Sequence, residues 1–445
     1  MVDSKSNFQY SKWSLLLSIL LVCFTRFQYH SDGSANGYNA TTWDALGYYL
    51  YLPGIFIYED VDKLAWIEKI DSQYHVTGGY YYQATPLENG NYVGKYLGGV
   101  AIMQLPFFAI GHAAAGFSGH PQDGFSAPYQ YAIIWGAVFW FVVGMLFLRK
   151  VLLRYYSELT TAIVLLLLVA ATNLLQYVAV NGSMSHAFIF PLYAMILWYS
   201  IKWAESPKPL YALIIGGVIG LATMCRPTEL IMLFIPLFWF VPGTTTFKPK
   251  WDLMLKHKTH LLFAAVGFFV MVSPQLIYWK YVTGSWMYDV GSKWYFLNPW
   301  WRVLIGFEKG WFIYTPVTIL FVAGLFFLKQ KPFRLAVIIF CVLNSWIIIS
   351  WHEWQYGASY STRALTQSYP VFALAFAAVI ERFVQSKLRW MLALIGAYLI
   401  FVNLFQTWQY NQGILHYDSM NAAYYKAIYL DADPSPEDYQ LMGND

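Results

Sequence analysis

The sequence predicts an all-α polytopic membrane protein with about eleven transmembrane helices. Of its 445 residues, 58% are hydrophobic and only 12% are charged, whereas a soluble domain usually carries about 25% charged residues. Phe, Trp and Tyr together make up 20% of the chain. Apolar runs long enough to cross lipid recur along its whole length. A soluble fold could not cover this apolar surface with so few charges, so lipid is the expected solvent.

The expected spans follow from these apolar runs. The first comes after a short basic segment, and no small-x-small cleavage site follows it, since the next residues are Thr25, Arg26 and Phe27. It is therefore expected to be retained as a helix. The eleven spans are expected at 13–27, 129–148, 159–179, 187–204, 209–224, 229–243, 261–281, 315–328, 333–350, 368–384 and 390–407.

The segment 97–115 is apolar as well, but charge argues for a helix lying at the membrane interface. With that placement, the cytoplasmic segments carry 17 of the 28 Lys and Arg residues and 5 of the 24 acidic residues. This is the positive-inside pattern. Gly98, Gly99 and Pro106 also suit an interfacial helix better than a straight span. The N-terminus is then cytoplasmic and the C-terminus outside.

This topology predicts one transmembrane domain, 1–409, followed by a short outer tail, 410–445. The acidic stretch DADPSPEDYQ of this tail is expected as a solvated extension, and the preceding AAYYKAIYL could form an amphipathic surface helix. The long outer loops are 28–128, with interfacial helices, and 282–314. The net charge of +4 is too small and dispersed for a nucleic-acid partner. Cys23, Cys225 and Cys341 lie in apolar stretches and have no metal-site spacing, although use of a divalent metal as cofactor stays open.

Asp44 is the first functional candidate, because isolated charges near a membrane are costly to keep there. It lies in TTWDALGYYLYLP, beside several aromatic residues. Desolvation among those rings is expected to raise the pKa of Asp44 and make it a better proton acceptor. The alternative is a helix N-cap, with the helix beginning at Ala45.

Three further candidates lie at outer span ends, each with a structural alternative. Glu59, Asp60 and Asp62 could bind a cation or a polar substrate, or form a solvated turn. His186 could bind a ligand or only make a hydrogen bond at the interface. Arg226, at the tip of the short helical pair, could bind phosphate or reach the lipid headgroups.

The two late outer segments combine cations with aromatic rings. The loop 282–314 offers Lys293, Arg302 and Lys309 among aromatic residues, a combination that suits an anionic headgroup and stacked sugar rings. The alternative is that these aromatic residues form the belt common at membrane surfaces. WHEWQYGASYSTRALTQSYP places Arg363 where a bidentate grip on phosphate is natural. The substrate-binding candidates are Glu59, Asp60, Lys95, Tyr96, His186, Tyr288, Asp289, His352, Trp354, Tyr356 and Tyr360.

These segments resemble the GT-C superfamily of membrane glycosyltransferases, which includes protein O-mannosyltransferases and the lipid A aminoarabinose transferases of bacteria. The segment around Asp44 resembles the acidic first outer loop of the family, and GKYLGGVAIMQLPFFAIGHAAAG resembles its juxtamembrane helix. Arg226-Pro227-Thr228 resembles the turn of its short helical pair. FEKGWFIYTP and WHEWQYGASYSTRALTQSYP resemble late outer-loop segments of bacterial members.

The resemblance implies an inverting transferase in a bacterial cytoplasmic membrane, with a polyprenyl-phosphate-linked sugar as donor. A hydroxyl of a glycan, lipid or protein would be the acceptor on the outer face. Asp44 would act as base or orient the acceptor, and Arg363, Lys309 and Arg226 would hold the leaving phosphate. A second acidic residue is left open among Glu59, Asp60 and Asp123. The tail is too short for the soluble domain of oligosaccharyltransferases, which argues against transfer of a whole oligosaccharide to asparagine.

Two other functions compete. A multi-span transporter usually shows internal repeats and ionisable residues at the membrane midplane. No repeat is visible in this sequence, and its charges lie at outer span ends. A lipid-linked glycan polymerase or ligase would share the topology and much of the chemistry.

Overall fold

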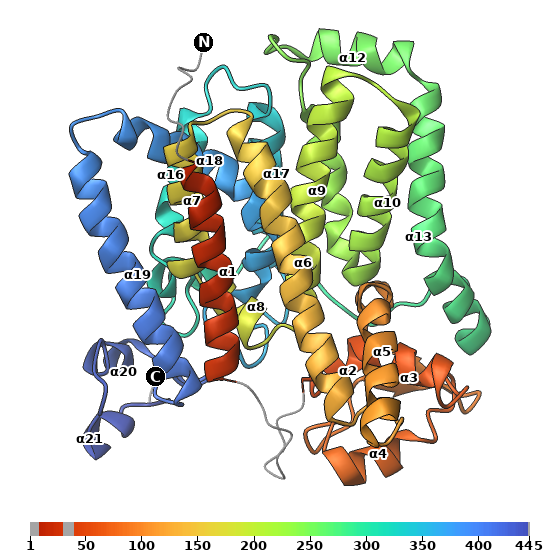
Figure 1. The fold of residues 1–445 in the computed structure, drawn as a ribbon. Helices are drawn as coiled ribbons and strands as arrows, with labels where there is room; N and C mark the ends of the chain where they lie inside the picture. The colour runs from red at the N-terminus through yellow and green to blue at the C-terminus, as the bar shows by residue number, and fades with distance from the viewer. Residues whose placement is uncertain (1–8, 30–39, 444–445) are drawn as a thin grey trace.

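The computed structural model describes residues 9–29 and 40–443. Residues 1–8 of the expected cytoplasmic start and residues 30–39 of the expected first outer loop therefore lie outside the described part. Within these ranges the chain forms a bundle of helices with a layer of short helices beyond one end (Figure 1). The sheet in the described part is a two-stranded antiparallel hairpin, with Thr85 opposite Val93. Its strands are β1 (Ala84–Pro86) and β2 (Tyr92–Gly94). The prediction of an all-α protein is confirmed.

Seven helices among the described residues are long and apolar enough to cross a membrane. They are α1 (Tyr10–Gln28), α5 (Gly99–Ser118), α6 (Ala127–Leu153), α9 (Ser185–Glu205), α13 (Thr259–Thr283), η3 with α18 (Arg363–Ser368 and Tyr369–Val384) and α19 (Arg389–Asn411). The protein is therefore an integral membrane protein. Length and composition support these seven spans and not the expected number of about eleven.

Six of the seven coincide with expected spans, and the remaining five expected spans coincide with shorter apolar helices. The shorter helices are α7 (Glu158–Ala170), α10 (Pro209–Cys225), η1 with α11 (Pro227–Leu233 and Phe234–Phe238), α16 with η2 (Thr318–Gly324 and Leu325–Phe327) and α17 (Arg334–Ile349). The break at Arg226-Pro227 falls where the sequence placed it, because the proline cannot continue the helix.

The third expected span, 159–179, is interrupted. Helix α7 ends at Ala170, and α8 (Leu174–Ala179) begins after a turn. Thr172 makes the turn stable, because its hydroxyl donates to Leu168 O at 2.6 Å and accepts from Leu174 N at 3.1 Å. The side chain of Asn173 makes further hydrogen bonds at this break, and its Oδ1 accepts from Tyr369 OH at 2.6 Å. Polar side chains satisfy the backbone where the helix opens.

Helix α5 is the seventh long helix and corresponds to the segment expected at the interface. It lies with α2 (Asp44–Tyr49), α3 (Tyr51–Phe56) and α4 (Ile67–Tyr74) in the layer beyond the lower ends of α9 and α10 (Figure 1). Pro106 lies inside it. Residues of α2, α3 and α5 pack into one hydrophobic cluster with the start of α6.

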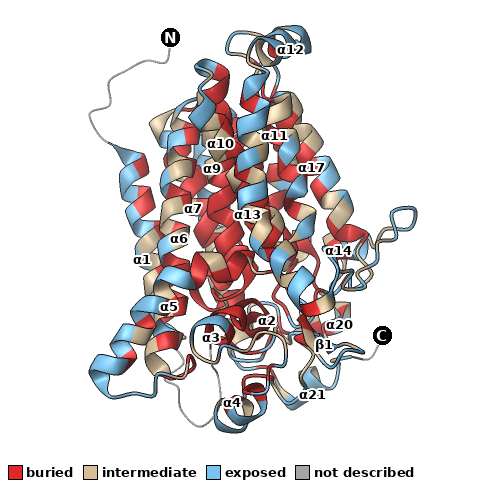
Figure 2. Ribbon diagram, turned by 90° about the vertical axis from the view of Figure 1, so that its right-hand side faces the viewer, coloured by how far each residue is buried: buried red, intermediate tan, exposed pale blue. Residues whose placement is uncertain are grey.

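Burial is greatest in the central helices, whereas few residues of α13 are buried (Figure 2). Helix α13 packs closely on α10 because glycines line their contact. A Cβ on Gly216 would lie 1.8 Å from Ala264 O, and one on Gly220 would lie 2.6 Å from Phe268 O. Small residues let helix backbones approach in this way within a membrane.

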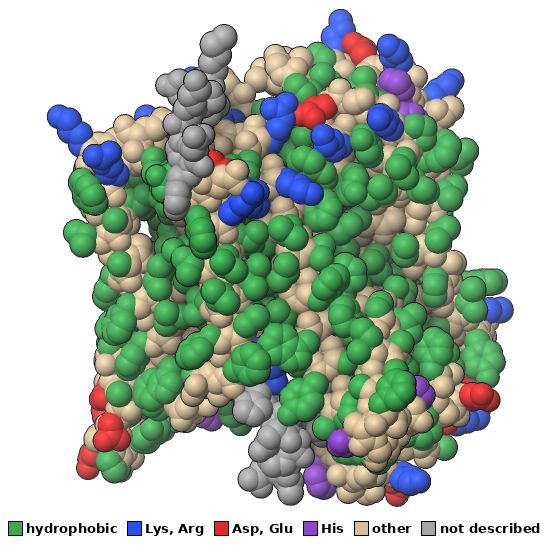
Figure 3. Space-filling view, viewed as in Figure 1, with side chains coloured by type: hydrophobic (Ala, Val, Ile, Leu, Met, Phe, Trp, Pro, Cys, Tyr) green, Lys and Arg blue, Asp and Glu red, His purple; other side chains and the backbone are tan. Residues whose placement is uncertain are grey.

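The remaining helices lie at the two ends of the bundle. Helix α12 (Phe247–Lys256) is at the end of the bundle where α1 begins, and α20 (Ala422–Ala427) and α21 (Pro436–Tyr439) are at the other end (Figures 1 and 2). The short helices α14 (Arg302–Ile305) and α15 (Trp311–Tyr314) lie in the segment between α13 and α16. On the face in Figure 3, most Lys and Arg side chains gather at the end with α12, and hydrophobic side chains cover the middle.

The tail has a packed first part and a more exposed acidic end. Ile414, Leu415 and Tyr424 belong to a buried hydrophobic cluster with Tyr314 and Tyr360. Helix α20 forms inside the segment for which a surface helix was the expectation. In the acidic stretch 431–440 only Pro434 is buried, as expected for a solvated extension.

Candidate functional site

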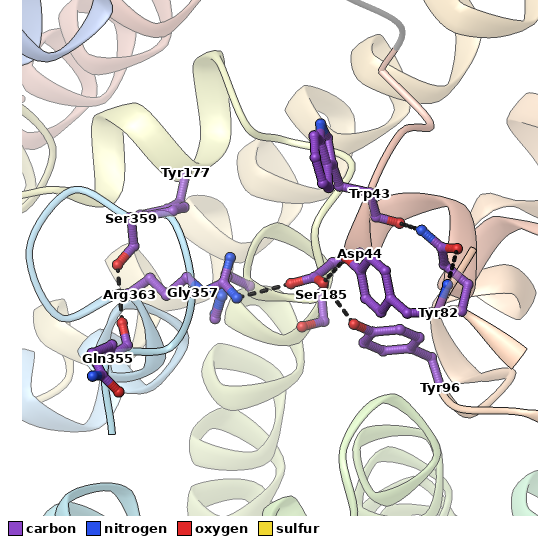
Figure 4. A network of polar contacts seen from close by, with 12 residues as sticks. Trp43, Asp44, Tyr82, Tyr96, Tyr177, Ser185, Gln355, Gly357, Ser359 and Arg363 are labelled. Atoms are coloured by element: carbon purple, nitrogen blue, oxygen red, sulfur yellow. Dashed lines mark hydrogen bonds and ion pairs between the residues drawn. The ribbon is translucent and has the colours of Figure 1, made fainter. Parts of the chain in front are cut away.

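Asp44 and Arg363, which are 319 residues apart in the chain, meet at one end of the bundle (Figure 4). Asp44 is the first residue of α2, and Arg363 is the first residue of η3. Arg363 Nη2 donates to Asp44 Oδ2 at 2.8 Å, and the two side chains are 11% and 22% exposed. Burying two charged groups has a large desolvation cost, which the short contact between them offsets. Charged groups held in this way are found often at functional sites.

Two tyrosines complete the coordination of the Asp44 carboxylate. The hydroxyls of Tyr82 and Tyr96 both donate to Asp44 Oδ1, each at 2.6 Å. Tyr82 precedes β1 and Tyr96 follows β2, so the hairpin brings both rings to the same carboxylate oxygen. Asp44 therefore uses its side chain in the site, whereas Trp43 occupies the N-cap position of α2.

These contacts reverse the expected shift of the Asp44 pKa. Burial raises this pKa, but the charge of Arg363 and the hydrogen bonds from Tyr82, Tyr96 and Arg363 outweigh burial and hold it at about 2. The expectation of a raised pKa was wrong because it counted the aromatic surroundings without the cation and the hydroxyl donors. The carboxylate is ionised at neutral pH and, while paired, is a weak proton acceptor.

The backbone before Asp44 is strained and firmly held. Trp43 has a φ of 54°, in the left-handed region that bulky residues rarely adopt. Its N–H donates to Val76 O at 3.2 Å, and its carbonyl accepts from Gln83 Nε2 at 3.1 Å. Strain of this kind costs about 1–3 kcal/mol and is found mostly at functional sites.

Arg363 still has a hydrogen-bond donor to offer. Its Nε is buried and has no hydrogen-bond partner among the described residues. The loop before it turns through left-handed conformations at Tyr356 (φ 55°), Gly357 (φ 62°) and Ser361 (φ 56°). The pair with Asp44 thus uses only part of the guanidinium, and an anion at this place could take the remaining N–H group.

Lys309 lies near Arg363 but is engaged in holding the loop. Its ammonium donates to Gln355 O at 3.2 Å and to Gly357 O, and it lies 3.5 Å from Asp418. Burial lowers the pKa of Lys309 to about 8, against the opposing effect of Asp418. This arrangement makes Lys309 a positioning residue for the loop that leads to Arg363, and the expected contact with phosphate would require it to leave these carbonyls.

Arg226 and His186 belong to a buried polar network beside the Asp44–Arg363 pair. Arg226 Nε donates to Ser185 Oγ at 2.9 Å, and its charge repels that of Arg363. His186 Nδ1 lies 2.6 Å from Gln367 Oε1 in η3. The network therefore places a second guanidinium near the first and braces the 3-10 helix that carries Arg363.

This network continues to the buried carboxylate of Glu229, three residues after Arg226 in the turn of the short helical pair. Gln367 Nε2 donates to Glu229 Oε1 at 2.5 Å, and Tyr193 OH donates to Glu229 Oε2. Glu229 is only 2% exposed. Gln367 and Tyr193 lie in apolar helices whose sequence gives no sign that they share a partner.

The early carboxylates do not join Asp44. Asp60 accepts backbone N–H groups from Lys63, Leu64 and Ala65 at 2.8–2.9 Å, so it forms the turn that was the structural alternative. Glu59 is exposed. Asp123 accepts from Phe125 N at 2.8 Å and from Tyr74 OH at 2.6 Å.

Of the remaining candidates, one contacts the Asp44 network directly and two are buried in the loop before Arg363. Lys95 lies over the Tyr82 ring, 5.2 Å from its centroid, and so joins the site. Tyr356 is buried, its hydroxyl donates to Ile348 O at 2.8 Å, and the charges of Arg226 and Arg363 act on it. Tyr360 is buried and its OH lies 3.4 Å from Tyr314 O, so it supports the loop.

Other candidates are part of the outer loops, where their contacts are with other loop residues. His352 N donates to Lys293 O at 3.0 Å, and Trp354 stacks on Trp300 at 6.0 Å between ring centroids. Tyr288 and Asp289 lie in the long loop after α13, where Asp289 Oδ1 accepts from Gly291 N at 2.8 Å.

The donor set at Asp44 does not fit a metal. Its two oxygens already accept three hydrogen bonds, one of them from a guanidinium. Among residues 9–29 and 40–443, no group of three or more His, Cys, Asp or Glu side chains could hold an ion. No chemical step is therefore assigned to a metal.

Comparison with known proteins identifies the fold but no close relative. No family model and no curated protein matches the chain. The oligosaccharyltransferase AglB from Archaeoglobus fulgidus, solved with an inhibitory peptide and a dolichol-phosphate, matches with a TM-score of 0.54 at 11% identity. The match covers 97% of this chain and 59% of the AglB chain. The chain therefore shares the fold of this archaeal oligosaccharyltransferase.

Two crystal structures of the Archaeoglobus fulgidus oligosaccharyltransferase are less similar. The apo form has a TM-score of 0.49 at 12% identity and is matched over 98% of this chain and 59% of its own. The form with zinc and sulfate has a TM-score of 0.48 at 13% identity, over 96% and 56%. The chain spans less than two thirds of the length of the matched proteins.

Proposed function

We propose that this chain is an inverting glycosyltransferase that moves a sugar from a polyprenyl-phosphate donor to an acceptor hydroxyl on the outer face of a bacterial cytoplasmic membrane. The observation that carries the proposal is the contact between Asp44 and Arg363 at one end of a GT-C bundle. It joins a carboxylate to a cation that retains a free N–H group. The similar AglB structure contains a dolichol-phosphate and a peptide, which supports a lipid-linked donor.

The proposed topology has eleven crossings, with the N-terminus cytoplasmic and the C-terminus outside. It uses six of the long helices and the five shorter apolar ones, and it leaves α5 at the outer interface. The clustering of Lys and Arg at the end with α12 supports this orientation (Figure 3). Asp44 and Arg363 would then face the outer side, at the opposite end from α12.

In the proposed reaction, Arg363 grips the donor phosphate, and the charge of Arg226 lowers the energy of the leaving group. The acceptor oxygen attacks the anomeric carbon on the face opposite the phosphate. The bond from that carbon to the phosphate oxygen breaks, and its electron pair leaves with the polyprenyl phosphate. The proton of the acceptor hydroxyl passes to an Asp44 oxygen, so configuration at the sugar is inverted.

The ion pair between Asp44 and Arg363 requires the donor to bind before Asp44 can accept a proton. With Arg363 in contact, the low pKa makes Asp44 a weak base. A donor phosphate that draws the guanidinium toward itself weakens this pairing, and the proton affinity of Asp44 rises. The carboxylate would therefore become an effective base only when the donor is in place, while Lys309 holds the loop before Arg363.

The test is transfer of label from a polyprenyl-phosphate sugar to a broad acceptor set in membranes containing each variant. Wild type should label an acceptor, and Asp44→Asn should lose at least about 100-fold in rate. Arg363→Lys should lose about tenfold or more, because lysine cannot make the planar two-point contact. Asp433→Asn is the matched control, because Asp433 is exposed in the tail and is not a site candidate, and it should be as active as wild type.

Transfer by Asp44→Asn at the wild-type rate would refute the assignment of the site. Absence of labelling by wild type, together with uptake of a solute into proteoliposomes, would support the transporter alternative. Addition of many sugar units to one lipid-linked product would support the polymerase or ligase alternative.

A further inference from the structure

Two exposed aromatic side chains and one half-buried aromatic side chain lie in the segments next to Asp44, and the proposed reaction does not use their rings. Trp43 is 55% exposed and Tyr80 is 73% exposed. The rings of Tyr80 and Tyr82 are nearly parallel, at 12°, with centroids 6.3 Å apart. We call Trp43, Tyr80 and Tyr82 the aromatic platform. Its connection to Asp44 is direct, because the Tyr82 hydroxyl donates to that carboxylate at 2.6 Å.

The backbone beneath the platform is built to hold it. Gly78 (φ 74°) lets the Trp43 indole pack against the chain, since a Cβ there would lie 2.4 Å from the ring. Thr77 anchors the same turn by donating from its N–H and its hydroxyl to Asp71, at 2.7 and 2.8 Å. The turn and the strained Trp43 backbone are therefore fixed together, although the rings they carry face solvent.

The Tyr82 part of the platform lies on the side of Asp44 away from Arg363. Figure 4 shows Arg363 on one side of Asp44 and the Tyr82 and Tyr96 rings on the other, while the Trp43 indole extends away from these two rings. In the proposed reaction the donor phosphate is at Arg363, and inversion requires the acceptor to approach from the opposite face. The platform is thus where an acceptor would rest, and this inference depends on the proposed function.

We infer that the platform binds a saccharide, so that the acceptor of this enzyme is a glycan. A pyranose ring presents a flat C–H face to the negative face of an aromatic ring. Its hydroxyls can bond to the Tyr80 and Tyr82 hydroxyls and to the exposed Lys95 ammonium, which lies 5.2 Å from the Tyr82 centroid. An acyl chain could use the rings but would leave these polar groups without partners, so a lipid tail fits less well.

The experiment measures binding of purified full-length protein in nanodiscs to an array of immobilised oligosaccharides with neutral, N-acetylated and acidic pyranoses. A parallel array presents random peptides. Wild type should bind at least one saccharide class, and Trp43→Ala and Tyr80→Ala should each weaken that binding about tenfold. The Tyr80 side chain is mostly solvent-exposed, so Tyr80→Ala is expected to fold normally and keeps the test valid if Trp43→Ala misfolds. Both variants should still bind a labelled polyprenyl-phosphate sugar.

The matched controls are Trp286→Ala and Tyr417→Ala, which remove outer-loop aromatic side chains that are 59% and 53% exposed. Both should bind saccharide as wild type does. Absence of saccharide binding, or equal binding by the platform variants, would overturn the inference. Peptide binding that needs Trp43 and Tyr80 would overturn it in favour of a protein acceptor.

A membrane anchor is the remaining outcome, and fluorescence detects it. If brominated phospholipids quench wild type more than Trp43→Phe, the indole lies in lipid and the inference is wrong. The proposed function is tested separately by transfer from the labelled donor. Saccharide binding without any sugar transfer would support the platform as a glycan site and refute the proposed transferase activity. Transfer to protein acceptors alone would support the transferase activity and refute the glycan site.

Discussion

Removal of the Arg363 charge should raise the pKa of Asp44 from about 2 to above its ordinary value of 3.8. The reason is the balance of effects at this carboxylate. Burial, the largest effect, raises the pKa, and Arg363 supplies both a charge and a hydrogen bond that lower it. In Arg363→Met, only the hydroxyls of Tyr82 and Tyr96 remain to oppose burial.

The magnitude follows from the present position of the pKa. A decrease from 3.8 to about 2 corresponds to roughly 2.5 kcal/mol in favour of the ionised form. This is what remains after burial has acted, so the favourable contacts together contribute more. Loss of one partner of a buried pair typically costs about 3–5 kcal/mol. An increase of at least about two pKa units is therefore expected in Arg363→Met.

Infrared titration of the protonated carboxyl band measures this pKa directly, with Asp44→Asn identifying the band. Arg302→Met is the control, because Arg302 is 53% exposed and pairs with Glu308 at 3.5 Å, away from Asp44. It should leave the Asp44 band unchanged. A pKa near 2 that persists in Arg363→Met would refute the assignment of Arg363 as the main stabilising partner.

The same balance fixes the sign of the pH dependence of stability. The pKa of Asp44 is lower in the folded protein than its ordinary value of 3.8. The stabilisation from the ionised carboxylate is therefore fully present above pH 3.8 and is lost as the pH falls from there to about 2. Thermal unfolding of Asp44→Asn should lack this component, and an identical acid dependence in both proteins would contradict it.

Three further predictions concern the surroundings of the site and the bundle. Tyr96→Phe removes one hydrogen bond to Asp44, so infrared titration should show a raised Asp44 pKa and transfer should slow about 3- to 10-fold; unchanged values would exclude this contact. Glu229→Ala leaves two buried donors without an acceptor and should destabilise the protein by about 2–4 kcal/mol, seen as a lower unfolding temperature in detergent. Gly216→Ala should destabilise by about 1–3 kcal/mol because its Cβ would overlap Ala264 O. Gly217→Ala, whose Cβ has its nearest neighbour at 3.8 Å, should be close to neutral, and equal effects at the two glycines would contradict the packing argument.

The sequence by itself determined the fold class and the positions of most helices. Hydropathy is a property of consecutive residues, so apolar runs locate helices without knowledge of their neighbours. The break at Arg226-Pro227 was equally local, because proline ends a helix wherever it packs. Asp44 and Arg363 could be singled out because ionisable residues at span ends are few in a chain with 12% charged residues.

Only the tertiary structure decided which of these residues meet and what they do there. A contact between residues 319 positions apart depends on how the helices pack, and no local pattern encodes it. The direction of the Asp44 pKa shift, the engagement of Lys309 with loop carbonyls and the arrival of Tyr82 at the carboxylate all follow from that packing. Electrostatic effects change within a few ångströms, and such distances are fixed only when the whole chain has folded.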